Sequence, residues 1–153
     1  MSMLPDADAA GPPYVGALLR LSLQRVRGEM RAAVQAAGFT DLQDAHWAIF
    51  TYPLPDGVRP SELARRTGAS RQAINHLIGQ LESLGYLERR GTGEASRRLV
   101  HMTPRGREVA GVILDCLRRL HRDWAAEIGQ ERFAELLSVL RRIAAPELPP
   151  TAR

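Results

Sequence analysis

The sequence contains no lysine and only one cysteine, and aromatic side chains make up only 5% of its 153 residues. One thiol cannot form an internal disulfide, so the composition suits a reducing compartment and predicts a cytoplasmic protein. So few aromatic residues argue against a β-sandwich and against a protein that stacks the bases of single-stranded nucleic acid. No apolar run approaches the ~20 residues that would span a membrane, so no membrane partner is expected.

Motifs for catalysis or metal binding are also missing. The four histidines are at least 20 residues apart, and no Cys/His pair has the spacing of metal ligands. Neither a nucleophile elbow nor a glycine-rich phosphate loop occurs. The sequence therefore predicts a protein that is not an enzyme and that holds no metal and no cofactor.

Apolar residues recur at helical spacing near both ends of the chain. They predict one long helix over residues 13–37 and another that begins at Thr103 and Pro104, an N-cap and a first-turn proline. The second helix breaks near Gly129, and a last helix follows it as far as Pro146.

These terminal helices carry more apolar surface than a small domain can cover. Residues 13–38 and 104–145 are therefore predicted to form the helical dimerisation region of a symmetric homodimer. The small, acidic segment 1–12 is predicted to be disordered, and residues 146–153 to form a flexible tail.

The central segment, residues 39–103, has a different pattern. Thr40 is predicted to cap a helix that stops near Pro53, and a very short strand fits around Val58. Two helices are predicted over 61–67 and 70–85, and two strands over 86–90 and 97–102. Two short helices joined by the turn TGAS and followed by a hairpin are the layout of a winged helix-turn-helix.

The positive charge is concentrated in the same region. The whole chain has a net charge of only +4. Ten arginines and four acids between Arg59 and Arg107 give this stretch +6, so the other 104 residues carry −2. A basic excess confined to a helix-turn-helix and its hairpin is the electrostatic pattern of a surface that binds phosphates.

The run SELARRTGASRQAINHLIGQLESLGYLERR, with LVHMTPRG after it, resembles the MarR family of transcriptional regulators. DLQDAHWAIF is similar to the second helix of one branch of that family. The likeness covers about residues 14–145, and its most specific part is Ser61–Arg90. It implies a mainly α fold with a small β-wing, in the order helix, helix, strand, helix, helix, strand, strand, helix, helix, which dimerises through its terminal helices.

The resemblance also implies how DNA would be bound. The helix over 70–85 would enter the major groove, where arginine suits guanine and glutamine or asparagine suits adenine. The candidate residues on this helix are Ser70, Arg71, Gln72, Asn75, His76 and Gln80, of which His76 could equally be a solvated surface residue.

The wing departs from the family pattern, because Glu94, Ala95 and Ser96 occupy the positions of the usual Asp-Arg-Arg-like tip. We hypothesise that Arg97, just past the tip and followed by Arg98, takes the minor-groove role. Arg89 and Arg90, at the base of the wing, are expected to hold phosphates or acidic neighbours rather than bases.

Family members often bind a small aromatic or phenolic ligand between the winged domain and the dimer helices. The corresponding candidates in this chain are His46, Trp47, Phe50, Tyr52, Leu19, Leu23 and Leu117. Core packing explains an aromatic residue at helical spacing equally well, and His46 could instead form a hydrogen bond across the dimer.

The sequence thus predicts a homodimeric regulator that binds double-stranded DNA at a pseudo-palindromic operator, with half-sites about one helical turn apart. Repression relieved by a small effector is the family's commoner mode. Two alternatives remain: an architectural, weakly specific DNA binder, and a helical ligand-binding or interaction dimer that does not bind DNA.

Overall fold

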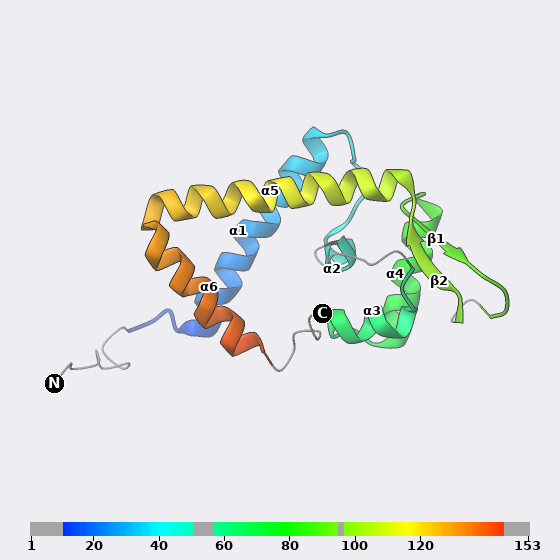
Figure 1. Ribbon diagram of the computed structural model, residues 1–153, viewed down its shortest axis with the longest axis horizontal. Coiled ribbons are helices and arrows are strands. Elements are labelled where there is room, and N and C mark those ends of the chain that lie inside the picture. Colours follow the sequence, from blue (N-terminus) through cyan, green and yellow to red (C-terminus); the bar gives the residue numbers. More distant parts are fainter. Residues whose placement is uncertain (1–10, 51–56, 95–96, 146–153) are drawn as a thin grey trace.

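The computed structural model of the chain describes residues 11–50, 57–94 and 97–145 (Figure 1). It is mostly helical, with one antiparallel sheet of two strands. This confirms the predicted fold class. The predicted tail and nearly all of the predicted disordered N-terminus lie outside the described residues.

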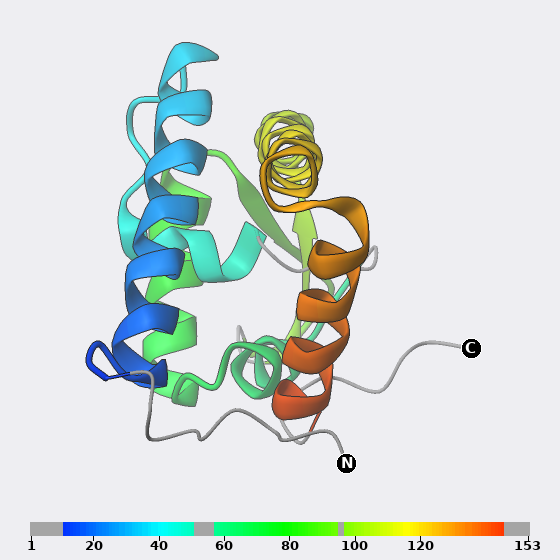
Figure 2. The ribbon, with the colours of Figure 1, turned by 90° about the vertical axis from the view of Figure 1, so that its left-hand side faces the viewer.

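Three long helices come from the two ends of the chain. They are α1 (Val15–Ala36), α5 (Pro104–Ile128) and α6 (Gln130–Ala144). The hydroxyl of Thr103 accepts a hydrogen bond from the N–H of Gly106 at 3.1 Å, which confirms the predicted cap of α5. Both α1 and α6 pack on α5, and Figure 2 shows them on either side of it.

The segment after α1 differs from its prediction. Instead of a helix capped by Thr40, a single 3-10 turn, η2 (Asp44–His46), leads into the short helix α2 (Trp47–Phe50). The helix starts late because Asp41 has long-range partners: its carboxylate accepts hydrogen bonds from the side chains of Tyr86 and Arg105. Residues 51–56, where this helix was predicted to end, lie outside the described residues.

The predicted helix-turn-helix is confirmed by α3 (Pro60–Thr67) and α4 (Arg71–Ser83). Gly68 ends α3 with φ +69°, a left-handed conformation that favours glycine. Ser70 then caps α4, because its hydroxyl accepts from the N–H of Ala73 at 3.1 Å. These two local signals fix the turn between the helices.

The wing consists of β1 (Leu87–Arg90) and β2 (Leu99–Met102), paired so that Leu87 lies opposite Met102. The prediction that the second strand begins at Arg97 is wrong, since Arg97 and Arg98 belong to the turn before β2. The predicted strand near Val58 is reduced to one antiparallel bridge with Val100, joined by hydrogen bonds of 3.0 and 2.8 Å.

The core lies where α1, α4 and α5 meet the base of the wing. Each helix contributes apolar residues at helical spacing, such as Met30 and Val34 from α1 and Ile74 and Ile78 from α4. The single cysteine, Cys116 on α5, is buried here, and burial raises the pKa of its thiol. Because Ile74 and Ile78 pack into this core, the inner face of α4 is fixed, while its outer face is exposed to solvent.

Candidate nucleic-acid interface

The N-terminal half of α4 presents polar side chains to solvent. Ile74 and Ile78 are fully buried on its inner face, whereas Arg71, Gln72 and His76 are exposed on the outer one. Ser70 is exposed as well, and its hydroxyl is used as the N-cap. Four of the six residues predicted on this helix therefore lie together at an accessible helix N-terminus.

The other two residues predicted on α4 have partners within the protein. Asn75 is half-buried and donates from its side-chain nitrogen to the carbonyl of Arg71 at 3.0 Å. Gln80, also half-buried, has its side-chain oxygen 3.2 Å from Nε2 of the buried His46. Sequence reasoning missed this second contact because it joins residues 34 positions apart.

The arginines of the basic segment fall into two groups. In the paired group, Arg65 and Arg66 both donate to Glu62, and Arg105 donates to Asp41. Nε of Arg89 lies 3.5 Å from the carboxylate of Glu82, and Arg90 pairs with Glu88. The hydrogen bond that Glu62 accepts from Arg65, and to a smaller extent the one from Arg66, holds the pKa of the Glu62 carboxyl below its usual value. The arginines that make no ion pair with any described residue are Arg59, Arg71, Arg97, Arg98 and Arg107.

The four wing arginines have different surroundings. Arg89 and Arg90, which are expected to hold phosphates or acidic neighbours, lie beside Glu82 and Glu88. Arg97 is exposed in the turn before β2, and its backbone N–H donates to the carbonyl of Glu94 at 2.9 Å. The Nε of Arg98 donates to the carbonyl of Gly93 at 3.0 Å, a contact that joins the two sides of the turn between β1 and β2.

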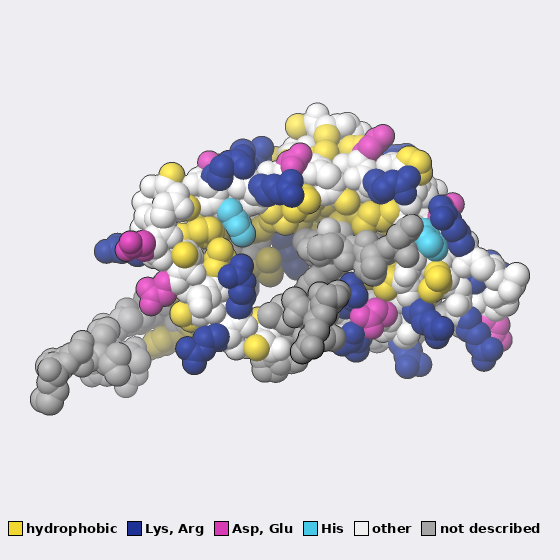
Figure 3. Space-filling model, viewed as in Figure 1, with side chains coloured by type: hydrophobic (Ala, Val, Ile, Leu, Met, Phe, Trp, Pro, Cys, Tyr) yellow, Lys and Arg dark blue, Asp and Glu magenta, His cyan; other side chains and the backbone are white. Residues whose placement is uncertain are grey.

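Basic side chains gather along one edge of the molecule, below α3 and beside the wing (Figure 3). Between α3 and the start of α4 the surface is hollowed, with a volume of about 560 Å³. Ser61, Arg65 and Arg71 are among the residues that line this hollow. An accessible helix N-terminus flanked by guanidinium groups can hold phosphates while the side chains of α4 reach base edges.

The candidate ligand residues do not all come together. Leu23, Trp47 and Leu117 line a pocket of about 130 Å³ between α1, α2 and α5. His46 and Phe50 are buried in the core instead, and Leu19 is 44% exposed on α1. Tyr52 lies outside the described residues. The pocket adds residues that the sequence did not single out, among them Arg27, an exposed residue of α1.

The described residues contain neither a membrane-spanning helix nor a cluster of metal ligands. None of their helices is long and apolar enough to cross a membrane. In the same ranges, no group of three or more His, Cys, Asp or Glu side chains is placed to hold a metal ion.

Two short helices, a turn with a left-handed glycine and a two-stranded hairpin define a winged helix-turn-helix protein. The sequence model of the MarR family matches residues 40–98, a range that includes η2, the helix-turn-helix and β1 and ends just before β2. Over these residues, the match confirms the predicted resemblance to the MarR family.

Several solved structures share the fold over nearly the whole chain. A MarR family transcriptional regulator from Rhodococcus sp. RHA1 is 20% identical, with a TM-score of 0.67, and the match covers 95% of this chain and 99% of that one. CouR from Rhodococcus jostii RHA1, bound to p-coumaroyl-CoA, is 19% identical with a TM-score of 0.66, covering 92% and 96%.

A third structure is a Mycobacterium tuberculosis MarR family protein in complex with salicylic acid. It is 25% identical with a TM-score of 0.60, and the match covers 88% of this chain and 98% of that one. Among curated proteins, no sequence matched the chain.

Proposed function

We propose that the protein is a homodimeric transcriptional regulator that binds a pseudo-palindromic DNA operator and responds to a small aromatic acid. The observation that carries this proposal is the outer face of α4, where Arg71, Gln72 and His76 are exposed at a capped helix N-terminus. Arg59 and Arg97, which make no ion pair with any described residue, add charge on the neighbouring elements. Such a face suits base contacts in a major groove flanked by phosphate contacts.

A second copy of the chain accounts for the exposed apolar surface of the terminal helices. Of the large apolar side chains that are exposed in the described part of the chain, all but Leu99 lie on α1, α5 and α6 or at the residue that precedes α1. They are Tyr14, Val15, Leu18, Leu19, Leu21, Leu23, Leu114, Ile128, Leu136, Val139 and Ile143. A monomer rarely leaves so much apolar surface in water, so we infer that this face is the dimer interface.

The oligomeric state can be tested by placing a charge in this face. Ile143, 64% exposed near the end of α6, is suited to the substitution Ile143→Glu. We expect light scattering to give a dimer for the wild type and a larger share of monomer for the variant. Thr92→Glu, which adds the same charge at the exposed wing tip, serves as the control and should leave the dimer intact.

The pocket between α1, α2 and α5 is the proposed effector site. Its walls are apolar, from Leu23, Val26, Met30 and Trp47, while Arg27 supplies a positive charge. An aromatic acid would place its ring on the walls and its carboxylate at the guanidinium. A related protein has been crystallised with salicylic acid, which supports this class of ligand, and another with p-coumaroyl-CoA, a thioester of an aromatic acid.

The DNA-binding proposal is tested by fluorescence anisotropy on DNA from upstream of the protein's own gene, against a random duplex of equal length at several salt concentrations. We expect preference for the upstream DNA and an affinity that falls steeply with salt. Equal affinity for both duplexes would favour an architectural DNA binder. No binding even at low salt would favour a ligand-binding or interaction dimer and would contradict the proposal.

A further inference from the structure

Apart from tyrosine, tryptophan and cysteine, His46 is the only polar residue among the described ones that is buried, with 2% of its surface exposed. It ends η2, directly before Trp47, which begins α2 and lines the proposed effector pocket. A buried imidazole needs hydrogen-bond partners, and this one has a partner at each ring nitrogen. These partners determine which protonation state the fold accepts.

The backbone N–H of Gln43 donates to Nδ1 of His46 at 3.0 Å. A nitrogen that accepts a hydrogen bond carries no proton, so the neutral ring holds its proton on Nε2. Nε2 lies 3.2 Å from the side-chain oxygen of Gln80 and therefore donates to it. The fold thus selects one form of His46, an acceptor toward η2 and a donor toward α4.

The turn that carries His46 is itself anchored to α1. Asp44 of η2 accepts from Arg31 of α1 at 2.6 Å, and the indole N–H of Trp47 donates to the same carboxylate at 3.3 Å. Gln80 lies on α4, about one turn beyond the exposed His76 and a little over two turns beyond the exposed Arg71 and Gln72. The contact between His46 and Gln80 therefore joins a turn fixed on α1 to the helix that presents the candidate base contacts.

We propose that His46 is a positioning residue for α4, which through Gln80 fixes the orientation in which the helix presents Arg71 and Gln72 to the DNA. This inference rests on the proposed function. Base contacts require a defined orientation of α4, whereas phosphate contacts tolerate a small rotation. Loss of the hydrogen bond should therefore reduce discrimination between operator and random DNA more than it reduces binding to random DNA.

Two substitutions of similar chemistry separate the two sides of the ring. In His46→Gln, the side-chain amide nitrogen takes a place near that of Nε2 and can still donate to Gln80. In His46→Asn, the amide oxygen takes a place near that of Nδ1, so the contact with Gln43 is kept and that with Gln80 is lost. On the other partner, Gln80→Glu keeps an acceptor oxygen, while Gln80→Leu removes it with little change in shape.

The measurement is the ratio of the dissociation constants for random and operator DNA, with the thermal unfolding midpoint recorded for every variant. We expect His46→Asn and Gln80→Leu each to lower the ratio about tenfold, and their combination to lower it no further. His46→Gln and Gln80→Glu should keep most of the wild-type ratio. Binding to random DNA should stay within about twofold of the wild type in all variants.

Three results would overturn the proposal. One is an unchanged ratio in His46→Asn despite a lower unfolding midpoint, which would make His46 a purely structural residue. Another is an equal loss in His46→Gln and His46→Asn, and the last is full additivity in the double variant. Gln80 is only half-buried, so Gln80→Leu provides a folded test if the His46 variants unfold. A wild type without operator preference would contradict the proposed function instead, before any variant is compared.

Discussion

The guanidinium of Arg105 lies over the ring of Tyr86, with its Cζ 4.5 Å from the ring centroid. The same guanidinium donates to Asp41 at 2.8 Å, and the phenol of Tyr86 also donates to Asp41. Tyr86 is completely buried and packs against the rings of Phe39 and Phe50. The three polar groups therefore connect the linker after α1, the start of the wing and the first turn of α5.

This cluster predicts a dependence of stability on alkaline pH. Burial, followed by the hydrogen bond with Asp41, raises the pKa of Tyr86 above its ordinary value. The folded state therefore favours the neutral phenol. Its contribution to stability is complete below the unfolded-state pKa of about 10 and is lost as the pH rises through the folded-state pKa.

At neutral pH we expect Tyr86→Phe to lower the free energy of unfolding, measured by urea denaturation, by about 1–2 kcal/mol, because a buried hydrogen bond is lost. Above about pH 10 the difference between the two proteins should shrink, since the wild type loses what the variant already lacks. The absence of lysine makes this comparison clean, because the three tyrosines and one cysteine are then the main side chains that titrate in this range. A difference that stays constant with pH would contradict the prediction.

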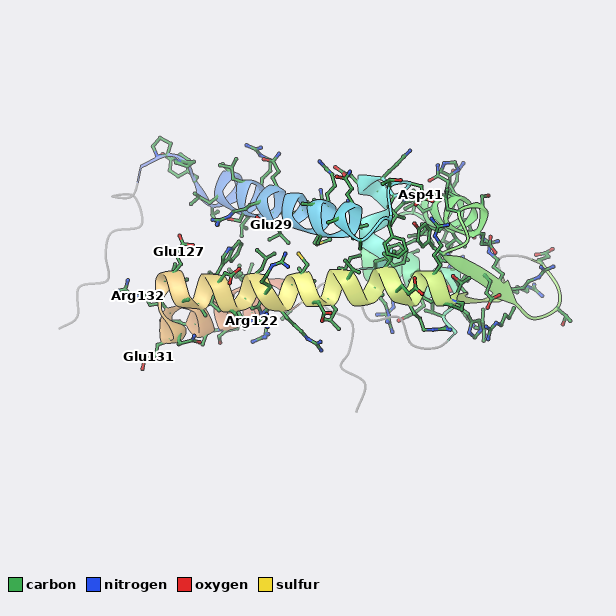
Figure 4. The ribbon with its side chains drawn as sticks, turned by 90° about the horizontal axis from the view of Figure 1, so that it is seen from above. Glu29, Asp41, Arg122, Glu127, Glu131 and Arg132 are labelled. Carbon is green, nitrogen blue, oxygen red and sulfur yellow. The ribbon has the colours of Figure 1, made fainter. Side chains whose placement is uncertain are left out.

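Arg97 is predicted to contact DNA from the wing. Arg97→Ala should weaken operator binding about tenfold and reduce the slope of log affinity against log salt by about 1. The matched control is Arg132→Ala, which removes the same charge at the opposite end of the molecule (Figure 4). Wild-type affinity and salt slope in Arg97→Ala would contradict the minor-groove role.

Glu62 is predicted to restrain the DNA affinity of α3. It holds Arg65 and Arg66 in ion pairs whose closest distances are 2.7 and 2.9 Å. Glu62→Gln should release both guanidinium groups, so that operator and random DNA bind about three- to tenfold more tightly with a steeper salt dependence. Glu131→Gln, far from the interface in Figure 4, controls for the change in net charge. Weaker binding in Glu62→Gln would mean that the ion pairs orient the arginines for phosphate contact.

Gly106 allows α5 to start close to the wing. A Cβ at this position would overlap the carbonyl oxygen of Tyr86, which also accepts from the N–H of Thr103 at 3.1 Å. Gly106→Ala should therefore destabilise the fold by about 1–3 kcal/mol in urea denaturation. Gly111→Ala, in the same helix but with open space at the Cβ, should stabilise it by about 0.5–1 kcal/mol. Equal effects of the two substitutions would contradict this explanation.

Arg27 is predicted to bind the carboxylate of the effector. Salicylic acid is a suitable probe, and Trp124→Phe leaves Trp47, which lines the pocket, as the remaining tryptophan. We expect salicylic acid to change the fluorescence of this variant, and Arg27→Ala to weaken the response about three- to tenfold. Arg20→Ala, an exposed arginine of α1 that does not line the pocket, is the control. An equal loss in both variants would contradict the assignment.

Elements with local signals were predicted well from the sequence. The caps at Ser70 and Thr103 and the break at Gly129 depend on residues close to them in the chain, and all three are confirmed. The helix expected from Thr40 was wrong because the competing partners of Asp41, Tyr86 and Arg105, are 45 and 64 residues away. Local propensity carries no information about such contacts.

In the candidate site, too, features with local signals could be predicted and long-range contacts could not. Exposure of Arg71, Gln72 and His76 follows from helical periodicity, since the apolar positions of α4 face the core. Which arginines are paired does not follow from the sequence alone, because Arg89 meets Glu82 across two elements. The contact of Gln80 with His46 could not be foreseen for the same reason. The predicted DNA contacts of these residues stay predictions.

The continuity of α5 has a mechanical consequence. One unbroken helix of 25 residues begins beside the wing and ends at the joint with α6, so it spans about 37 Å as a rigid rod. If such a rod pivots by about 5° at its far end, its tip moves by about 3 Å, close to the 3.4 Å spacing of base pairs. A slight repacking among α1, α5 and α6 would thus shift α4, the helix proposed to read DNA, by nearly one base step, without any change inside the winged domain.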